Sequence, residues 1–178
     1  NDVPAGTASA VLVSGTEDTG YVVSAADLLQ GFSDVDGDTL SVSDLQSSSG
    51  TVTDHQDGTY TVTPGQDDNG LVTLSYDVID GQGGLISSQL QFTLQATNDV
   101  PAGTASAVLV SGTEDIGYAV SAADLLQGFS DVDGDTLSVS GLQSSSGTVT
   151  DHQDGTYTVT PGQDDNGLVT LSYDVIDG

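Results

Sequence analysis

The sequence predicts an all-β protein made of two tandem β-sandwiches, each built from seven short strands. Three observations lead to this prediction. Residues 98–178 repeat residues 1–81, hydrophobic and polar residues alternate in short segments, and clusters of Gly, Asp, Asn and Pro separate these segments. Alternation is typical of half-buried strands, and short strands bounded by regular turn signals are typical of a sandwich or barrel.

The repeat covers a whole domain. Asn1-Asp2-Val3-Pro4 returns as Asn98-Asp99-Val100-Pro101, which is a shift of 97 residues. A solenoid repeat has a period of about 20–50 residues, so each copy is a domain of its own. Because proline interrupts a strand, we place the domain boundary at this motif and predict domains over 1–97 and 98–178. Only three of the 81 aligned pairs differ: Thr19/Ile116, Val22/Ala119 and Asp44/Gly141.

The first half of each copy is expected to hold two strands and a short helix. In the first copy, alternation predicts strands over 8–13 and from Tyr21 to Val23. The segment Ser24-Ala25-Ala26-Asp27 has the pattern of a capping box, which predicts a helix over 25–30 ended by Gly31. The candidate core residues of this part are Leu28, Leu29 and Phe32.

The second half is expected to hold five strands. Asp57-Gly58 is a strong hairpin signal between two of them. The strand over 71–79 places Val72, Leu74, Tyr76 and Val78 on one side. Seven strands in about ninety residues indicate immunoglobulin-like topology, although the chain has neither the cysteine pair nor the tryptophan of antibody domains. The expected strands are 39–43, 50–55, 59–63, 71–79 and a last one that contains Ile86, Leu90, Phe92 and Leu94.

The second copy lacks its last strand. The sequence ends at Gly178, so no residues correspond to Gln82–Thr97. We expect strand 168–176 to have an open edge, unless a further segment or another molecule supplies the missing strand. The side chains expected to be exposed there are Val169, Leu171 and Tyr173.

Charge and composition exclude several classes of function. The chain has 27 acidic residues and no Lys or Arg, so its formal net charge is −27. Binding of nucleic acid and polybasic contact with a membrane both need Lys or Arg. The absence of Cys excludes thiol catalysis and disulfides, and no apolar run approaches the roughly 18 residues of a membrane span. Such a charge is also typical of disorder, which the alternating β-branched and aromatic residues contradict.

The acidic residues gather in the predicted turns. Topology brings turns from both copies and the linker to the junction between the domains, where many carboxylates without a side-chain cation predict a bound divalent ion. Oxygen ligands from flexible loops suit calcium. The alternative is that these acids are solvated residues of the turns and bind no ion. An EF-hand is excluded, because counting from Asp34 places Thr39 and Leu45 where it needs Gly and Glu. The candidate metal ligands are Glu17, Asp18, Asp67, Asp68, Asn98, Asp99, Asp131, Asp133, Asp135 and Asp177 at the junction, with Asp34, Asp36, Asp38 and Asp80 elsewhere in the first copy.

A set of motifs follows in order along the repeat: Glu17-Asp18-Thr19-Gly20, Ser24–Leu29, Asp34–Asp38, Asp57-Gly58-Thr59-Tyr60, Asn69-Gly70, Asp80-Gly81-Gln82-Gly83-Gly84 and Asn98–Pro101. As a set they resemble the bacterial cadherin-like repeats that extend very long repeats-in-toxin adhesins. The resemblance implies an extracellular, calcium-rigidified stalk at the bacterial cell surface, secreted through a one-step channel without a cleaved signal. Its partners would be calcium and neighbouring identical repeats, without direct membrane contact. The ligands carried over by resemblance are Glu17, Asp67, Asn98, Asp99, Asp131, Asp133 and Asp177.

The expected function is therefore that of a spacer without catalytic activity, which holds the ligand-binding tip of an adhesin away from the cell. The alternative is a carbohydrate- or protein-binding module, which would need exposed aromatics on one face. The chain has only six Tyr and three Phe, mostly at inward positions. An enzyme is not expected, because His55 and His152 lack a nucleophile elbow or oxyanion hole and the paired acids lie in polar turns.

Overall fold

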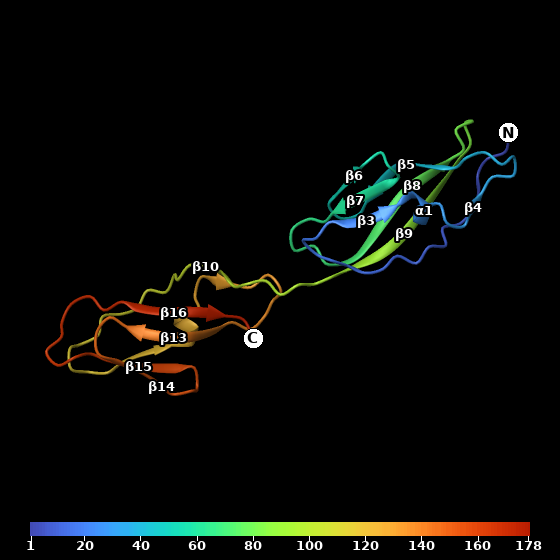
Figure 1. The fold of residues 1–178 in the computed structure, drawn as a ribbon. Coiled ribbons are helices and arrows are strands. Elements are labelled where there is room, and N and C mark those ends of the chain that lie inside the picture. Colours follow the sequence, from blue (N-terminus) through green and yellow to red (C-terminus); the bar gives the residue numbers. More distant parts are fainter. The chain divides into compact units, whose positions relative to one another are not determined.

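A computed structural model describes the whole chain, residues 1–178. The chain divides into two compact units, Asn1–Thr97 and Asn98–Gly178, which we call repeat 1 and repeat 2 and describe one at a time (Figure 1). Both consist of short β-strands and one four-residue helix, so the expected all-β class is confirmed.

Repeat 1 is a sandwich of two sheets with seven strands. Strand β2 runs parallel to β9, and every other pair is antiparallel. A separate pair, β1 with β4, lies outside these sheets. The four-stranded sheet has the order β2 (Gly15–Thr16), β9 (Leu85–Gln95), β8 (Gly70–Ile79) and β5 (Ser41–Ser47). The three-stranded sheet has the order β3 (Tyr21–Ser24), β7 (Thr59–Thr63) and β6 (Thr51–Asp54), and the separate pair is β1 (Ala5–Gly6) and β4 (Phe32–Ser33).

The core of repeat 1 lies between the two sheets. Strand side chains alternate between the two faces of a sheet, and the inward set here is hydrophobic, as expected for β8 and β9. Tyr21 of β3 stacks on Phe92 of β9 with ring centroids 3.9 Å apart, which joins the sheets through aromatic contact. The buried set is Tyr21, Val23, Leu28, Tyr60, Val62, Val72, Leu74, Tyr76, Val78, Leu90, Phe92 and Leu94.

The strand expected over 8–13 is absent. The alternation itself is real, because Ala8, Ala10 and Leu12 pack on the core while Val11 and Val13 are exposed. The backbone of this segment does not pair with another strand, because the strands that do pair are β1 before it and β2 after it. Periodicity therefore predicted which side chains point inward but not the hydrogen bonding.

A short helix closes one side of the core. Helix α1 (Ala25–Leu28) begins at the N-cap Ser24, and Ser24 and Asp27 form the expected capping box. It ends two residues earlier than expected, and Gly31 follows with a φ of 94°. Leu28 is fully buried, and its carbonyl accepts a hydrogen bond of 2.7 Å from the Tyr76 hydroxyl. The helix thus positions a core side chain and satisfies a buried hydroxyl.

Repeat 2 keeps this arrangement without counterparts of β2 and β9. Strand β16 pairs only with β13, so one edge of this sheet is free. The buried core is correspondingly small, with Val120, Leu125, Tyr157 and Val159. The elements are β10 (Ala102–Gly103) with β12 (Phe129–Ser130), β11 (Tyr118–Ser121) with β15 (Thr156–Thr160) and β14 (Thr148–Asp151), β13 (Ser138–Ser144) with β16 (Leu171–Ile176), and α2 (Ala122–Leu125).

Candidate metal-binding loops

A three-aspartate loop follows β4 in repeat 1. The backbone N–H groups of Asp36 and Asp38 donate to Oδ1 of Asp34 at 2.8 and 3.3 Å, which turns the loop back on itself. One carboxylate oxygen from each of the three residues lies within 4.8 Å of the others. The Oδ2 atom of Asp34 is buried and has no hydrogen-bond partner. A buried charged oxygen without a partner is costly, so this atom fits a bound cation.

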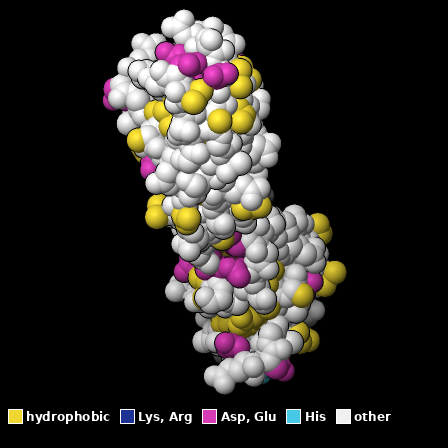
Figure 2. All heavy atoms as spheres, turned by 90° about the vertical axis from the view of Figure 1, so that its right-hand side faces the viewer, with side chains coloured by type: hydrophobic (Ala, Val, Ile, Leu, Met, Phe, Trp, Pro, Cys, Tyr) yellow, Lys and Arg dark blue, Asp and Glu magenta, His cyan; other side chains and the backbone are white.

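Repeat 2 forms the same loop with Asp131, Asp133 and Asp135. Oδ1 of Asp131 accepts the N–H groups of Asp133 and Asp135 at 3.0 and 3.2 Å, and Oδ2 of Asp131 is again buried without a partner. The three carboxylates again lie within 4.8 Å of one another. Figure 2 shows acidic side chains in groups on the visible face, with no Lys or Arg beside them.

The first two residues of each repeat bind the three-aspartate loop and the aspartate that follows β8 or β16. In repeat 2, the N–H of Asp99 donates to Oδ2 of Asp133 at 2.8 Å, and Nδ2 of Asn98 donates to Oδ2 of Asp177 at 2.8 Å. The corresponding bonds in repeat 1 join Asp2 to Asp36 at 2.6 Å and Asn1 to Asp80 at 2.7 Å. The structure thus brings the predicted ligands Asn98, Asp99, Asp131, Asp133, Asp135 and Asp177 into one end of repeat 2.

Asp80 is a buried acid held by several donors. Only 4% of its surface is exposed. Oδ1 accepts the N–H groups of Gln82 and Gly84 at 2.7 and 2.8 Å. Burial raises the pKa of Asp80, but the hydrogen bonds from Gln82, Asn1 and Gly84 outweigh it and hold the pKa below its usual value. Asp80 therefore stays ionised, and these donors already bind both of its oxygens.

A second acidic group lies at the β2 end of repeat 1. Glu17 is only 2% exposed, and its Oε1 accepts the N–H of Thr97 at 2.6 Å. Its Oε2 accepts Nδ2 of Asn69 at 3.1 Å. The N–H of Asp67 donates to Oδ1 of Asp18 at 3.1 Å, so the turn that contains Asp67 contacts the turn that contains Glu17 and Asp18. These contacts bring Glu17, Asp18 and Asp67 together with the last residue of the repeat.

Two details of this group were not predicted. Asp68 points elsewhere, because its Oδ2 accepts the hydroxyl of Ser49 at 2.8 Å. Asn69 takes its place and donates from Nδ2 to Oε2 of Glu17, a contact that no local pattern of the sequence indicates. In repeat 2 the counterpart Glu114 is exposed, and no residues correspond to Thr97.

The donor set is that of a hard cation. All side-chain ligands are carboxylate or amide oxygens, which suit calcium or magnesium and not the soft metals that prefer thiolates. Three carboxylates on a flexible loop give fewer than the six to eight oxygens that calcium takes, so backbone carbonyls or water would complete the shell.

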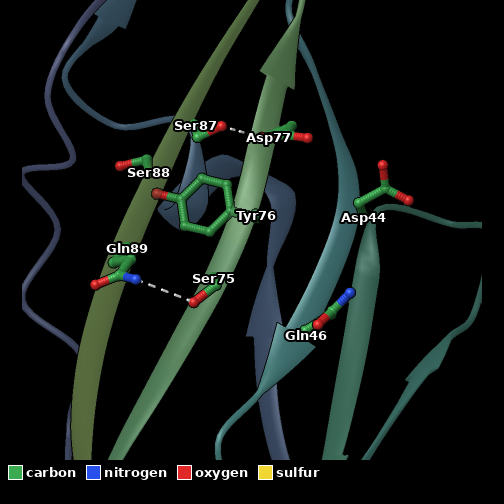
Figure 3. A pocket seen from close by; sticks show the side chains of 8 residues that line it. All are labelled: Asp44, Gln46, Ser75, Tyr76, Asp77, Ser87, Ser88 and Gln89. Carbon is green, nitrogen blue, oxygen red and sulfur yellow. Dashed lines mark hydrogen bonds between the residues drawn. The ribbon is translucent and has the colours of Figure 1, made fainter.

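A shallow hollow on repeat 1 lies apart from these loops (Figure 3). It crosses β5, β8 and β9, and hydrogen bonds of 2.6 Å from Ser87 to Asp77 and 3.3 Å from Gln89 to Ser75 span its floor. Tyr76 is only 3% exposed, so it presents no open ring for a sugar to stack on. The lining residues are Asp44, Gln46, Ser75, Tyr76, Asp77, Ser87, Ser88 and Gln89.

A family comparison decides the affiliation of the chain. A model of the cadherin-like domain matches residues 1–95 and again residues 97–178. The chain belongs to the cadherin-like domain family. Domains of this family typically bind calcium and are usually extracellular. Neither helix of this cadherin-like chain is long and apolar enough to cross a membrane.

Comparisons with individual proteins add little to this affiliation. No curated protein matches the cadherin-like chain significantly. Solved structures similar to it are those of the endo-fucoidan hydrolase MfFcnA4 from glycoside hydrolase family 107, at 20% identity and a TM-score of 0.40, and of a variant of it, at 19% and 0.42. Endo-fucoidan hydrolase MfFcnA9 is similar at 17% and 0.36. The matches cover 98% of this chain but only 28%, 28% and 34% of those chains.

Proposed function

We propose that this chain is a calcium-binding extender of a bacterial cell-surface adhesin, which spaces the ligand-binding tip away from the cell. The observation that carries the proposal is the three-aspartate loop, which occurs in both repeats with one buried carboxylate oxygen left without a partner. The chain has no Lys or Arg that could pair with such a carboxylate, so a bound cation is a natural partner for it. Calcium ions would be held by Asp34, Asp36 and Asp38 in repeat 1 and by Asp131, Asp133 and Asp135 in repeat 2.

The way each repeat holds its own end supports a stiffening role. Glu17 binds the backbone of Thr97, the last residue of repeat 1, and Asp133 binds the backbone of Asp99, the second residue of repeat 2. Only Asn98 separates these two anchored residues in the sequence. Calcium bound by the same carboxylates would restrain this short linker at both ends, which suits a spacer.

Calorimetric titration with calcium tests the binding. Extracellular calcium modules bind at about 10⁻⁴–10⁻³ M, so we expect saturable heat in this range for the calcium-free chain. The Asp131→Asn variant should lose the sites of repeat 2 and keep those of repeat 1. Asp174→Asn removes the same charge from an exposed position on β16 and is the matched control. Equal losses in the two variants, or no heat in the wild type, would contradict calcium binding.

Thermal unfolding tests whether calcium acts through sites or through screening. Millimolar calcium is about one to ten times the Kd of such modules, where binding to the folded state alone stabilises by about 0.4–1.4 kcal/mol per site. We therefore expect millimolar calcium to raise the Tm of both repeats, whereas sodium chloride at the same ionic strength raises it much less. The same shift with both salts would mean that screening of the −27 charge accounts for the whole effect.

A further inference from the structure

Asn69 is followed directly by a glycine, Gly70, and the same pair recurs as Asn166-Gly167. The chain has only four asparagines, and each of the other two, Asn1 and Asn98, is followed by an aspartate. Glycine has no side chain to shield its backbone nitrogen. In an Asn-Gly pair, this nitrogen can therefore reach the side-chain carbonyl carbon of the asparagine.

The structure leaves the pair in repeat 1 open. Asn69 is exposed and lies in the connection between β7 and β8, and Gly70 is the first residue of β8. Gly70 has a φ of 99°, and a Cβ built on it would meet nothing within 4 Å. No packed neighbour on that side of Gly70 hinders a rearrangement of the backbone at this pair.

The amide of Asn69 has a specific partner. Its Nδ2 donates to Oε2 of Glu17 at 3.1 Å. Glu17 is only 2% exposed, and its other oxygen, Oε1, accepts the N–H of Thr97. A buried carboxylate oxygen needs a donor, and the neutral amide of Asn69 supplies one. Any loss of this amide therefore acts on Glu17.

We propose that Asn69 is a site of spontaneous deamidation, which replaces the donor to Glu17 by a carboxylate. The Gly70 nitrogen loses its proton and bonds to Cγ of Asn69, while the bond from Cγ to Nδ2 breaks and ammonia leaves. Water then adds to one carbonyl of the resulting succinimide ring and breaks the bond from that carbon to nitrogen. The product is aspartate, or isoaspartate if the other carbonyl is attacked, and water is the only co-reactant.

The new charge has a predictable effect on the fold. Oε2 of Glu17 loses its donor and faces a second carboxylate, in a group that already contains Asp18 and Asp67. An unsatisfied buried acceptor and a like charge both destabilise the folded state. Deamidation should therefore loosen the β2 end of repeat 1 when no cation is present.

Calcium should reverse this effect, an inference that rests on the proposed function. A carboxylate oxygen is a better calcium ligand than the amide that it replaces, because it carries charge. The modified group would bind calcium more tightly than the original one. Deamidation of Asn69 would thus make the stability of repeat 1 more dependent on calcium as the protein ages.

Mass spectrometry of the aged full chain tests the reaction. Residues 45–81 and 142–178 are identical, so a peptide that contains Asn69 cannot be told from one that contains Asn166. The experiment therefore uses the Asn166→Gln chain, digested with pepsin because trypsin has no Lys or Arg to cleave. Peptides with Asn69 should gain the difference between water and ammonia, faster at higher pH, and should take up a heavy oxygen isotope from labelled water. Peptides with Asn1 or Asn98 should change much more slowly.

Thermal unfolding of the Asn69→Asp chain tests the consequence. In chelator, we expect the Tm of repeat 1 to fall by at least about 4 °C. Gln66→Glu makes the same amide-to-acid change at an exposed position of the same connection and should lower the Tm by less than about 2 °C. Millimolar calcium should raise the Tm of repeat 1 more in Asn69→Asp than in the wild type.

Three outcomes would overturn the proposal. The first is a mass gain at Asn69 that is absent or no faster than that at Asn98. The second is an equal fall in Tm for Asn69→Asp and Gln66→Glu, and the third is an equal shift by calcium in Asn69→Asp and the wild type. The first two are measured without calcium, so they decide the deamidation and its cost even if calcium binding itself fails in the titration of the three-aspartate loops.

Discussion

At the scale of single residues, the two near-identical repeats provide built-in comparisons. Of the three pairs of residues that differ, only Asp44 and Gly141 lie where the backbone has a positive φ. Asp44 has a φ of 50° at the irregularity of β5, and Gly141 has a φ of 62° at the same place in repeat 2. A positive φ crowds the Cβ of any residue except glycine, so repeat 1 carries local strain that repeat 2 avoids.

Replacing Asp44 by Gly should therefore stabilise repeat 1. We expect a gain of about 0.5–1 kcal/mol, less than the full cost of the left-handed conformation, because glycine also makes the unfolded chain more flexible. The reverse change, Gly141→Asp, should destabilise repeat 2 by a similar amount. Urea unfolding followed by signals from each repeat measures both. A loss of stability on Asp44→Gly would show that the aspartate makes a contact worth more than the strain.

A second residue-scale prediction concerns Asp57 in the β6–β7 hairpin. The Thr59 hydroxyl and N–H donate to its Oδ1 at 2.6 and 2.9 Å. These bonds, with a smaller contribution from His55, hold the pKa of Asp57 below its usual value. A lowered folded-state pKa stabilises the fold above the unfolded-state pKa, and this contribution is lost as the pH falls through the folded-state pKa.

Removing the Thr59 hydroxyl tests how much its hydrogen bond lowers the pKa of Asp57. In Thr59→Val, we expect the pKa of Asp57 to rise toward its usual value, as followed by NMR titration of the carboxyl carbon. Asp154 has the same contacts with Thr156 and serves as the internal control, so its pKa should not move. If the pKa of Asp57 stayed low in the variant, the backbone N–H would be its main cause.

At the scale of elements, helix α1 depends on both its cap and a core side chain. Helix α1 is only four residues long, far below the length at which a helix is stable alone. It forms because the capping box satisfies its first N–H groups and because Leu28 is packed in the core. The cap therefore affects the core as well as the helix.

Ser24→Ala should destabilise repeat 1 by about 1 kcal/mol, the usual cost of losing an N-cap side chain. Ser24→Thr keeps the hydroxyl acceptor and should cost only a fraction of that. The corresponding Ser121→Ala should affect repeat 2 alone. Denaturant unfolding of the single variants checks all three. Equal effects of Ala and Thr would mean that the hydroxyl has no capping role and that the site tolerates neither side chain.

At the scale of the whole molecule, the proposed function depends on the freedom of the linker. Asp133 accepts the backbone N–H of Asp99 and belongs to the three-aspartate loop of repeat 2. Asp133→Asn should weaken the binding of calcium at this loop. It should leave both cores intact, because Asp133 lies in an exposed loop.

Small-angle scattering in calcium checks this prediction. We expect the wild type to give a narrow distribution of distances between the repeats, and Asp133→Asn to give a broader one. Asp174→Asn, with the same change in charge, should behave as the wild type. Circular dichroism of the variants should show unchanged strand content. If chelator and Asp133→Asn both leave the scattering unchanged, metal does not control the linker.

Local features of the sequence determined much of this structure. The period of 97 residues defined the copies, the alternation in 71–79 identified the inward residues of β8, and Ser24–Asp27 identified the helix start. The last two of these signals depend on neighbouring residues alone. Local features also placed the acidic clusters at Glu17-Asp18, Asp34–Asp38 and Asp67-Asp68 between strands, where the structure has them.

Contacts between distant segments were decided only by the tertiary structure. Alternation shows which side chains of 8–13 point inward, but the parallel pairing of Gly15–Thr16 with Leu94–Gln95 depends on a partner about eighty residues away. For the same reason, sequence could not tell that Asn69 and not Asp68 contacts Glu17, or that one oxygen of Asp34 is buried without a partner. Periodicity records the face of a side chain, whereas its partner is set by how the two sheets close on each other.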